Sequence, residues 1–283
     1  MNDSFGNIYI LGAGGKMGDR ITNSLIRSGI TPAQYEISDN GIEIIHEKGL
    51  DITPPEQAMP QADVAIFALP DRLLGKLTAE YVPLAKPGSL IILLDPAVVF
   101  AREAYLRNDC TTAVMHPCHP QLFFEQPNEE ARNDHFGGIA GLQDIVISFV
   151  NGERKLFDEV AMPLSRLMFS PVMNSFEITV EQMALLEPAA TEVINTALIQ
   201  AMRVTMDEVV RAGIPEAAAK SFVLGHMQQG LAVYFLNTNP ISDAAQLAAR
   251  AGWKAIIKPD WKQALGIEFT RDITKKMLHP ELE

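Results

Sequence analysis

Short apolar runs alternate with amphipathic stretches along the first part of the chain. The runs that predict buried strands are 8–11, 62–70, 89–94 and 112–115, with a shorter one at 35–38 that Asp39 closes. The stretches between these runs are long enough for helices that cross over a sheet. Near-continuous apolar strands alternating with helices are typical of a parallel sheet covered on both faces. The pattern therefore predicts an α/β fold built on a doubly wound, Rossmann-type parallel sheet.

The alternation extends as far as residue 178. Residues 144–150 form another apolar run, 153–168 carry apolar side chains at helical spacing, and 172–178 suit one more strand. We therefore expect residues 1–178 to form the first domain.

From residue 179 onward, the apolar spacing is helical only. Residues 179–212 carry apolar side chains on nearly every face, and a helix that is apolar all round is buried on all sides. Gly213 ends this helix, and Pro215 suits the first turn of the next. A domain of about 100 residues is too small to bury such a helix by itself, which suggests that a second subunit covers it. We expect residues 179–283 to be an all-α domain that binds substrate and forms a homodimer.

Charge and composition narrow the possible partners. The chain has 283 residues, a formal charge of −12 and no basic run, which argues against nucleic acid and anionic membranes. The polar N-terminus does not resemble a signal peptide, and no apolar segment is long enough to span a membrane. The two cysteines, Cys110 and Cys118, are too few for a disulfide framework. We expect a cytoplasmic protein with reduced thiols.

A glycine-rich turn follows the first predicted strand and precedes a predicted helix. The residues expected to bind a dinucleotide here are Gly12, Gly14, Gly15, Lys16, Met17 and Gly18. Glycines allow the backbone N–H groups to approach a pyrophosphate, which the helix N-terminus stabilises. The spacing is G-x-x-G-x-x-G instead of the usual G-x-G-x-x-G. A purely structural turn therefore stays open as an alternative.

Two further positions are expected to border the cofactor. Asp39, at the end of the second predicted strand, can accept hydrogen bonds from the ribose of NAD and would repel the 2′-phosphate of NADP. Leu69 lies at the end of the third predicted strand, where ligands of doubly wound sheets bind. The sequence thus favours NAD, with a solvated Asp39 as the alternative.

The sequence Met-His-Pro-Cys-His-Pro, at 115–120, follows another predicted strand. His116 and His119 are each followed by proline, so a stiff turn holds both imidazoles at the cofactor-binding edge. An imidazole there can be a general base, a hydrogen-bond donor or a metal ligand. The alternative is that one or both histidines only cap the turn.

Glu187 lies in the apolar sequence Leu-Leu-Glu-Pro-Ala-Ala of the helical half. A carboxylate among apolar residues is costly to bury unless it is paired or binds a metal. On a regular helix Asn195 shares its face, and Pro188 is expected to kink the helix. An exposed Glu187 beside a proline is the alternative.

Together these residues suggest a metal site. His116 and Glu187 are the predicted ligands of a divalent cation, Zn²⁺ or Mg²⁺, and His116, Glu187 and Asn195 are the predicted catalytic residues. A cation with open positions would act as a Lewis acid on a hydroxy-carbonyl substrate.

The motifs resemble those of a known superfamily. The glycine turn with Met17-Gly18, the strand Ala-Asp-Val-Ala-Ile-Phe-Ala-Leu-Pro and the helical second half resemble the 6-phosphogluconate dehydrogenase-like, β-hydroxyacid dehydrogenase superfamily. The lysine expected four residues before Asn195 is replaced by Thr191, so the resemblance does not extend to a lysine base. The His-Pro turn also looks like that of prephenate dehydrogenases.

Within the superfamily the Met-His-Pro-Cys-His-Pro turn and the Leu-Glu-Pro-Ala-Ala helix are most similar to the D-apionate oxidoisomerase group. This resemblance implies NAD-dependent oxidation of an acid-sugar substrate at its 2-hydroxyl, coupled to an α-ketol rearrangement. A simple NAD-dependent hydroxyacid or prephenate/arogenate-type dehydrogenase, and a non-enzymatic NAD-binding redox sensor, are the alternatives.

Overall fold

The computed structural model describes residues 5–282, which form two compact units. The first unit runs to Ala184 and includes the chain again from Arg271, and the second comprises Leu185–Thr270. The polar residues 1–4, at which we expect no signal peptide, lie outside the described residues. Among residues 5–282, no helix combines the length and apolar character needed to cross a bilayer.

One seven-stranded sheet organises the first unit, with the order β2-β1-β3-β4-β5-β6-β7. The strands are β1 (Ile8–Leu11), β2 (Ala33–Tyr35), β3 (Val64–Phe67), β4 (Leu90–Leu93), β5 (Thr111–Pro117), β6 (Gln143–Asn151) and β7 (Val172–Glu177). Strands β1 to β5 are parallel to one another, which confirms the predicted fold class. The register aligns their carboxyl ends, since Leu11 pairs with Phe67 and Phe67 with Leu93.

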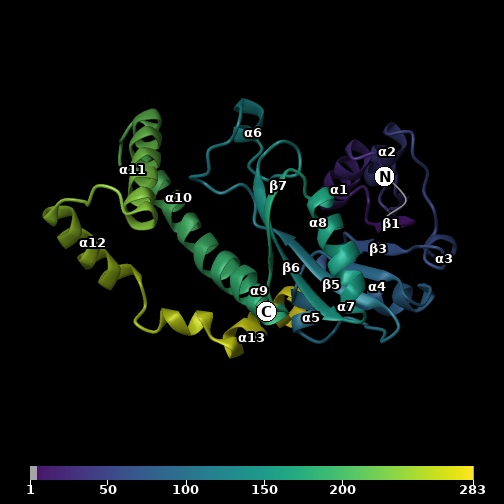
Figure 1. The fold of residues 1–283 in the computed structure, drawn as a ribbon. Helices are drawn as coiled ribbons and strands as arrows, with labels where there is room; N and C mark the ends of the chain where they lie inside the picture. The colour runs from purple at the N-terminus through teal and green to yellow at the C-terminus, as the bar shows by residue number, and fades with distance from the viewer. Residues whose placement is uncertain (1–4, 283) are drawn as a thin grey trace. The chain divides into compact units, whose positions relative to one another are not determined.

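Helices cover both faces of this sheet (Figure 1). They are α1 (Lys16–Arg27), α2 (Asp39–Glu47), α3 (Pro55–Ala58), α4 (Asp71–Tyr81), α5 (Ala97–Phe100), α6 (Glu129–Asn133), α7 (Arg154–Leu156), α8 (Met162–Met168) and α9 (Val180–Ala184), with a 3₁₀ turn η2 (Val82–Leu84) and a π-helical turn η3 (Phe157–Ala161). On one face, α4, α5 and α9 bury residues against Tyr9 and Leu11 of β1. On the other, α1 and α8 pack against Ile8 and Ile10. The alternation of side chains along each strand thus creates two cores.

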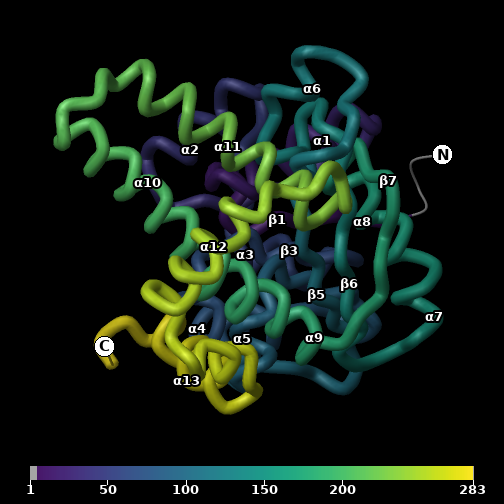
Figure 2. Tube along the Cα trace, turned by 90° about the vertical axis from the view of Figure 1, so that its left-hand side faces the viewer, coloured from purple at the N-terminus to yellow at the C-terminus, as the bar shows by residue number. Residues whose placement is uncertain are grey.

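The second unit is helical, as expected. It contains the π-helical segment η4 (Leu185–Asn195), α10 (Thr196–Arg211), α11 (Glu216–Leu236), α12 (Asp243–Ile256) and the 3₁₀ turn η5 (Trp261–Leu265). Helices α10 and α11 lie side by side (Figures 1 and 2). Helix α13 (Ile267–Leu278) begins in this unit, and from Arg271 the chain, including η6 (Pro280–Leu282), belongs to the first unit.

The structure differs from the sequence-based expectations in two ways. Strand β6 is antiparallel to β5, and β7 is parallel to β6, so the last two strands reverse direction. The β5–β6 connection contains only the short α6, and without a crossover helix the chain returns antiparallel. The units also divide at Ala184 instead of residue 178, because α9 contributes Met183 and Ala184 to a core of the first unit.

A single carboxylate organises the long β5–β6 connection. The buried Asp134 accepts hydrogen bonds of 2.9–3.0 Å from the N–H groups of Gly137, Ile139, Ala140 and Gly141. Burial alone would raise the pKa of Asp134, but these N–H groups hold it below its ordinary value. The connection is therefore fixed by its main chain.

We expect Asp134→Ala to lower the free energy of unfolding by about 3 kcal/mol at neutral pH, because it leaves several buried N–H groups without an acceptor. Since the folded-state pKa is lowered, the stabilisation is complete above the unfolded pKa of about 4 and is lost as the pH falls through the folded value. Urea unfolding at several pH values measures this difference. Asp51→Ala, at an exposed loop position, is the control. An equal loss in both variants, or a difference that grows on acidification, would contradict the assignment.

Candidate functional site

The glycine turn and the histidine turn both emerge at the carboxyl edge of the parallel strands. The glycine turn follows β1, and His116 lies near the carboxyl end of β5 (Figure 1). Because β1 to β5 are parallel, these ends face the same edge of the sheet. The site is therefore built where doubly wound sheets bind their ligands.

The close packing of the glycine turn requires its glycines. Gly12 has a φ of +79°, and a Cβ atom there would lie 2.3 Å from the carbonyl oxygen of Ala68. A Cβ atom on Gly18 would lie 2.1 Å from the carbonyl oxygen of Gly12. Leu69 also borders the turn, since its Cδ2 atom would lie 2.9 Å from a Cβ atom on Gly12. Gly15 is the N-cap of α1, so the helix N-terminus opens directly from the turn.

An acidic residue not predicted from the sequence contacts this turn. Glu36, immediately after β2, accepts a hydrogen bond of 3.2 Å from the N–H of Gly14. Its other oxygen accepts from the N–H groups of Ile37 and Ser38. A carboxylate at the end of the second strand commonly binds the ribose of a dinucleotide. Because β2 ends at Tyr35, Glu36 occupies that position.

The sequence pattern predicted that Asp39 closes the second strand, and this prediction is wrong. It is the first residue of α2, and the Ser38 hydroxyl caps that helix by accepting from the N–H of Gly41. Serine is a strong N-cap, and its signal outweighed the apolar run at 35–38. Asp39 is therefore an exposed residue of the first helical turn.

Two predicted cofactor residues of α1 have different environments. The Lys16 ammonium lies 3.7 Å from the centre of the Phe136 ring, in the β5–β6 connection. Met17 packs against the core beneath α1. The connection thus contacts the glycine turn through a cation–π interaction.

His116 is oriented by the main chain and by a carboxylate. Its Nδ1 donates a hydrogen bond of 2.8 Å to the carbonyl of Leu94, so Nε2 carries the lone pair of the neutral ring. A carboxylate oxygen of the buried Asp95 lies within 4.8 Å of a ring nitrogen of His116. Removal from water lowers the pKa of His116. The hydrogen bond to Leu94 and the charge of Asp95 act to raise this pKa, but burial outweighs them. The ring is therefore neutral at pH 7, as metal binding requires.

Asp95 was missed in the sequence, although it directly follows the predicted strand 89–94. Its Oδ1 accepts a hydrogen bond of 2.7 Å from the N–H of Ala97 at the start of α5. The strand-end argument used for Leu69 would have found it.

His119 has an unusual backbone conformation. Its φ is +60°, and its Nδ1 donates a hydrogen bond of 2.8 Å to the carbonyl of Phe136. The His119 and Phe136 ring centres are 4.8 Å apart, and those of His119 and His116 are 6.2 Å apart. Both imidazoles thus use Nδ1 to bind a main-chain carbonyl.

Glu187 and Asn195 lie in the second unit, on the π-helical segment η4. Pro188 within this segment has no N–H to donate, so the α-helical pattern cannot continue there. The predicted common face of Glu187 and Asn195 assumed α-helical spacing, which the π-helix does not have. Glu187 is half-buried and Asn195 exposed.

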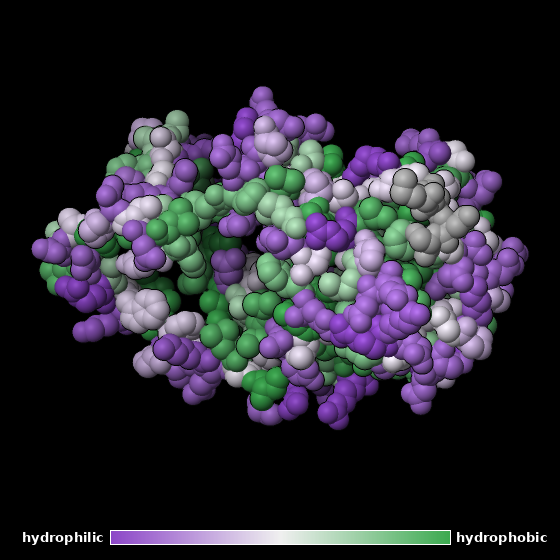
Figure 3. All heavy atoms as spheres, in the orientation of Figure 1, coloured by the Kyte–Doolittle hydropathy of each residue, from purple (hydrophilic) through white to green (hydrophobic). Residues whose placement is uncertain are grey.

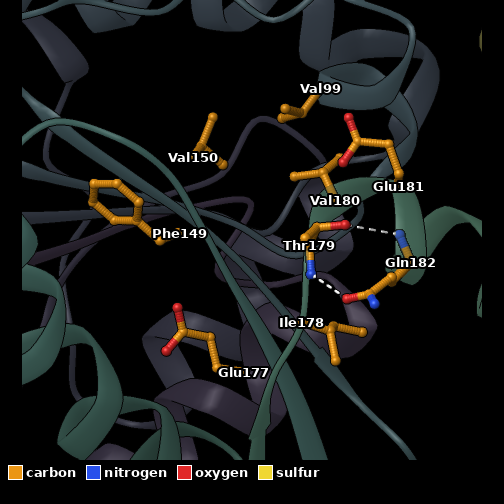
Figure 4. A pocket seen from close by; sticks show the side chains of 9 residues that line it. All are labelled: Val99, Phe149, Val150, Glu177, Ile178, Thr179, Val180, Glu181 and Gln182. Atoms are coloured by element: carbon orange, nitrogen blue, oxygen red, sulfur yellow. Dashed lines mark hydrogen bonds between the residues drawn. The ribbon is translucent and has the colours of Figure 1, made fainter.

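A hollow of about 530 Å³ lies elsewhere on the first unit, and Figure 4 shows its lining. It is bordered by Val99, Phe149 and Glu177, and by Thr179 and Gln182, which hydrogen-bond to each other. None of the residues predicted from the sequence lines it, so it is distinct from the strand-end site.

A Rossmann-type sheet with a glycine turn and a polar strand-end cluster defines the class of dinucleotide-dependent oxidoreductases. A family model described as phosphogluconate dehydrogenase (decarboxylating) C-term matches residues 124–278. A D-apionate oxidoisomerase of Blautia hydrogenotrophica is 40% identical over 97% of both chains. Another, from Cupriavidus necator, is 39% identical and covers 90% of this chain and 92% of its own. The protein therefore belongs to the D-apionate oxidoisomerase family, within the 6-phosphogluconate dehydrogenase-like superfamily.

One solved structure shares the fold over nearly the whole chain. A semialdehyde dehydrogenase NAD-binding protein from Cupriavidus necator, in complex with calcium and NAD, has a TM-score of 0.92 and 36% identity. That match covers 96% of this chain and 99% of the other.

We expect Gly18→Ala to weaken NADH binding by about tenfold or more, because the added Cβ atom displaces the Gly12 carbonyl and with it the turn. Titration by NADH fluorescence measures the affinity, and circular dichroism checks the fold. The control is Gly75→Ala on α4, where the nearest heavy atom is 3.5 Å from the new Cβ atom. Unchanged affinity in a folded Gly18→Ala protein would argue against this turn as the dinucleotide site.

Proposed function

We propose that the protein oxidises D-apionate with NAD⁺ and rearranges the product to 3-oxo-isoapionate. The observation that carries this proposal is the 40% identity to a D-apionate oxidoisomerase over nearly the whole chain. The similar NAD complex supports the choice of cofactor. The two carboxylates after β2, Glu36 and Asp39, favour NAD over NADP because they would repel a 2′-phosphate.

The reaction balances in two steps. In the first, C2 transfers a hydride to NAD⁺ and its hydroxyl loses a proton, which gives a 2-oxo acid. In the second, the bond between C3 and one hydroxymethyl carbon breaks as that carbon bonds to C2. The C3 hydroxyl becomes a ketone, and the C2 ketone becomes a hydroxyl. The only net oxidant is NAD⁺.

We further propose that His116 and Glu187, the ligands predicted from the sequence, are joined by Asp95 of the neighbouring strand end, and that each gives one ligand atom to a divalent cation, Mg²⁺ or Zn²⁺. One imidazole and two carboxylates are a donor set that both ions accept. When bound, the cation would supply Lewis-acid polarisation of adjacent substrate oxygens. The calcium in the similar structure supports a cation in this family.

Chain connectivity supports the inclusion of Glu187. It follows Ala184 by three residues, which can span about 11 Å at most. Ala184 ends α9, which packs against α5, and α5 begins two residues after Asp95. The chain therefore keeps Glu187 within about 11 Å of the end of α9.

The protein groups prepare this donor set before any ligand binds. The Leu94 carbonyl fixes the tautomer and plane of His116, and the Ala97 N–H holds one oxygen of Asp95. Such outer contacts orient ligands and raise their affinity. The catalytic role of Asn195 stays a prediction.

We expect purified enzyme to form NADH from D-apionate and NAD⁺, to lose turnover with a chelator and to regain it when Mg²⁺ or Zn²⁺ is restored. His116→Ala and Glu187→Ala should each abolish metal-dependent turnover yet bind NADH with unchanged affinity. NADH absorbance measures the oxidation, and ¹³C NMR of the product identifies the rearranged carbon skeleton.

A variant with the carboxylate removed outside the proposed site is the matched control. Glu181→Ala, on the exposed side of the preceding turn, should keep full activity. An unrearranged 2-oxo acid would instead favour a simple dehydrogenase, and full activity of both site variants would refute the metal site.

The protein is proposed to be a homodimer through its second unit. Green apolar residues are exposed over this unit (Figure 3). They include Leu198, Ile199 and Met202 of α10 and Phe222 and Phe235 of α11. Only Ala219 of the 21 residues of α11 is buried, although most of the helix is apolar. A second copy that covers α11 would remove this surface from water.

We expect Phe222→Glu to convert the dimer to a monomer, because it places a charge in the apolar surface. Light scattering after size exclusion measures the mass. Leu122→Glu, at an equally exposed apolar position of the first unit, should stay dimeric. A monomeric wild-type protein at micromolar concentration would overturn the proposed assembly.

The cytoplasm is the proposed compartment. Both cysteines are free, Cys110 buried and Cys118 exposed, which fits a reducing environment.

A further inference from the structure

His119 has a left-handed backbone conformation. A φ of +60° is uncommon for a residue with a side chain, and glycine or asparagine adopts it at lower cost. Strained residues of this kind cluster at functional sites. The imidazole is therefore a candidate for a function other than shaping the turn.

The main chain fixes the tautomer of this imidazole. The Phe136 carbonyl can only accept a hydrogen bond, so Nδ1 of His119 carries the hydrogen in their 2.8 Å contact. The Phe136 ring packs against the imidazole with a centre-to-centre distance of 4.8 Å. Phe136 itself belongs to the connection that Asp134 fixes. The ring is thus held in one orientation.

The other ring nitrogen is available to a ligand. Nε2 of His119 makes no hydrogen bond within residues 5–282, and the residue is half-buried. In the neutral ring with hydrogen on Nδ1, Nε2 carries a lone pair and accepts a hydrogen bond. Its partner must therefore be a donor. A substrate hydroxyl can donate, whereas a carboxylate cannot.

The position of His119 selects which hydroxyl it meets. Its ring centre is 6.2 Å from that of His116, and the two planes are nearly perpendicular, at 84°. In the proposed function, His116 would help to hold a cation that polarises the C2 and C3 oxygens. The His119 ring, whose centre is 6.2 Å from that of His116, then reaches a substituent of C2 or C3 instead of the C2 and C3 oxygens themselves.

We propose that His119 is a specificity-determining residue, whose Nε2 accepts a hydrogen bond from a terminal hydroxyl of the hydroxymethyl groups on C3. This inference rests on the proposed function and extends it to the choice of substrate. The imidazole distinguishes branched polyhydroxy acids from acids of the same skeleton that carry methyl groups. A methyl group would leave Nε2 buried against carbon with no donor.

The test compares two acids in the same site. D-Apionate and 2,3-dihydroxy-3-methylbutanoate share the carboxylate and the vicinal hydroxyls, and only D-apionate has terminal hydroxyls. Calorimetry measures the dissociation constant of each acid for the metal-loaded enzyme–NADH complex, so no turnover is needed. Wild-type enzyme is expected to prefer D-apionate.

His119→Asn is the informative variant, because asparagine tolerates the left-handed backbone and its amide can donate to Phe136 in place of Nδ1. It lacks an acceptor at the position of Nε2. The variant should bind D-apionate about tenfold more weakly and the methyl acid within about twofold of wild type. His135→Asn, at an exposed position of the same connection, should change neither affinity.

Two results would overturn the proposal. One is equal weakening of both acids by His119→Asn, which indicates a structural role. The other is unchanged affinity for D-apionate. NADH affinity and the unfolding midpoint of the variant establish that the turn is intact. A wild-type enzyme that binds D-apionate but does not oxidise it would refute the proposed function separately, because the binding comparison does not depend on turnover.

Discussion

The parallel in-register pairing of β1, β3, β4 and β5 is the constraint on which the site depends. Parallel strands end at a common edge, so the glycine turn, Asp95 and His116 meet there although they are far apart in the sequence. The two apolar cores hold the strands from both faces. Any change that shifts this pairing would separate the chemistry-bearing turns from one another.

Strands β1, β3, β4 and β5 could be predicted from the sequence because they are buried on both faces and leave continuous apolar runs. Strand β2 is less buried and begins two residues before the run at 35–38. The direction of β6 could not be predicted. Its apolar residues fit either direction, and the direction follows from the β5–β6 connection, which has no crossover helix and whose path is held by contacts of Asp134 with four main-chain N–H groups. No apolar periodicity encodes such a contact.

The site was predictable where a residue type and a strand end coincided, as at His116. The sequence-based prediction failed where a helix cap or a proline changed the local geometry. Ser38 starts α2 and moves the strand-end position from Asp39 to Glu36. Pro188 is part of a π-helical segment, so the spacing from Glu187 to Asn195 no longer defines one face. These effects depend on individual hydrogen bonds, which the 3.6-residue and two-residue periods do not report.

The contacts of Asp134 determine which residues of the β5–β6 connection can be substituted. The carboxylate binds only main-chain atoms, so it makes no demand on the side chains of Ile139 or Ala140. Ile139 is exposed, and evolution or a mutant library can vary it while the backbone path is retained. Relatives can thus differ at positions 139 and 140 and still share the shape of the loop, provided that the aspartate is kept.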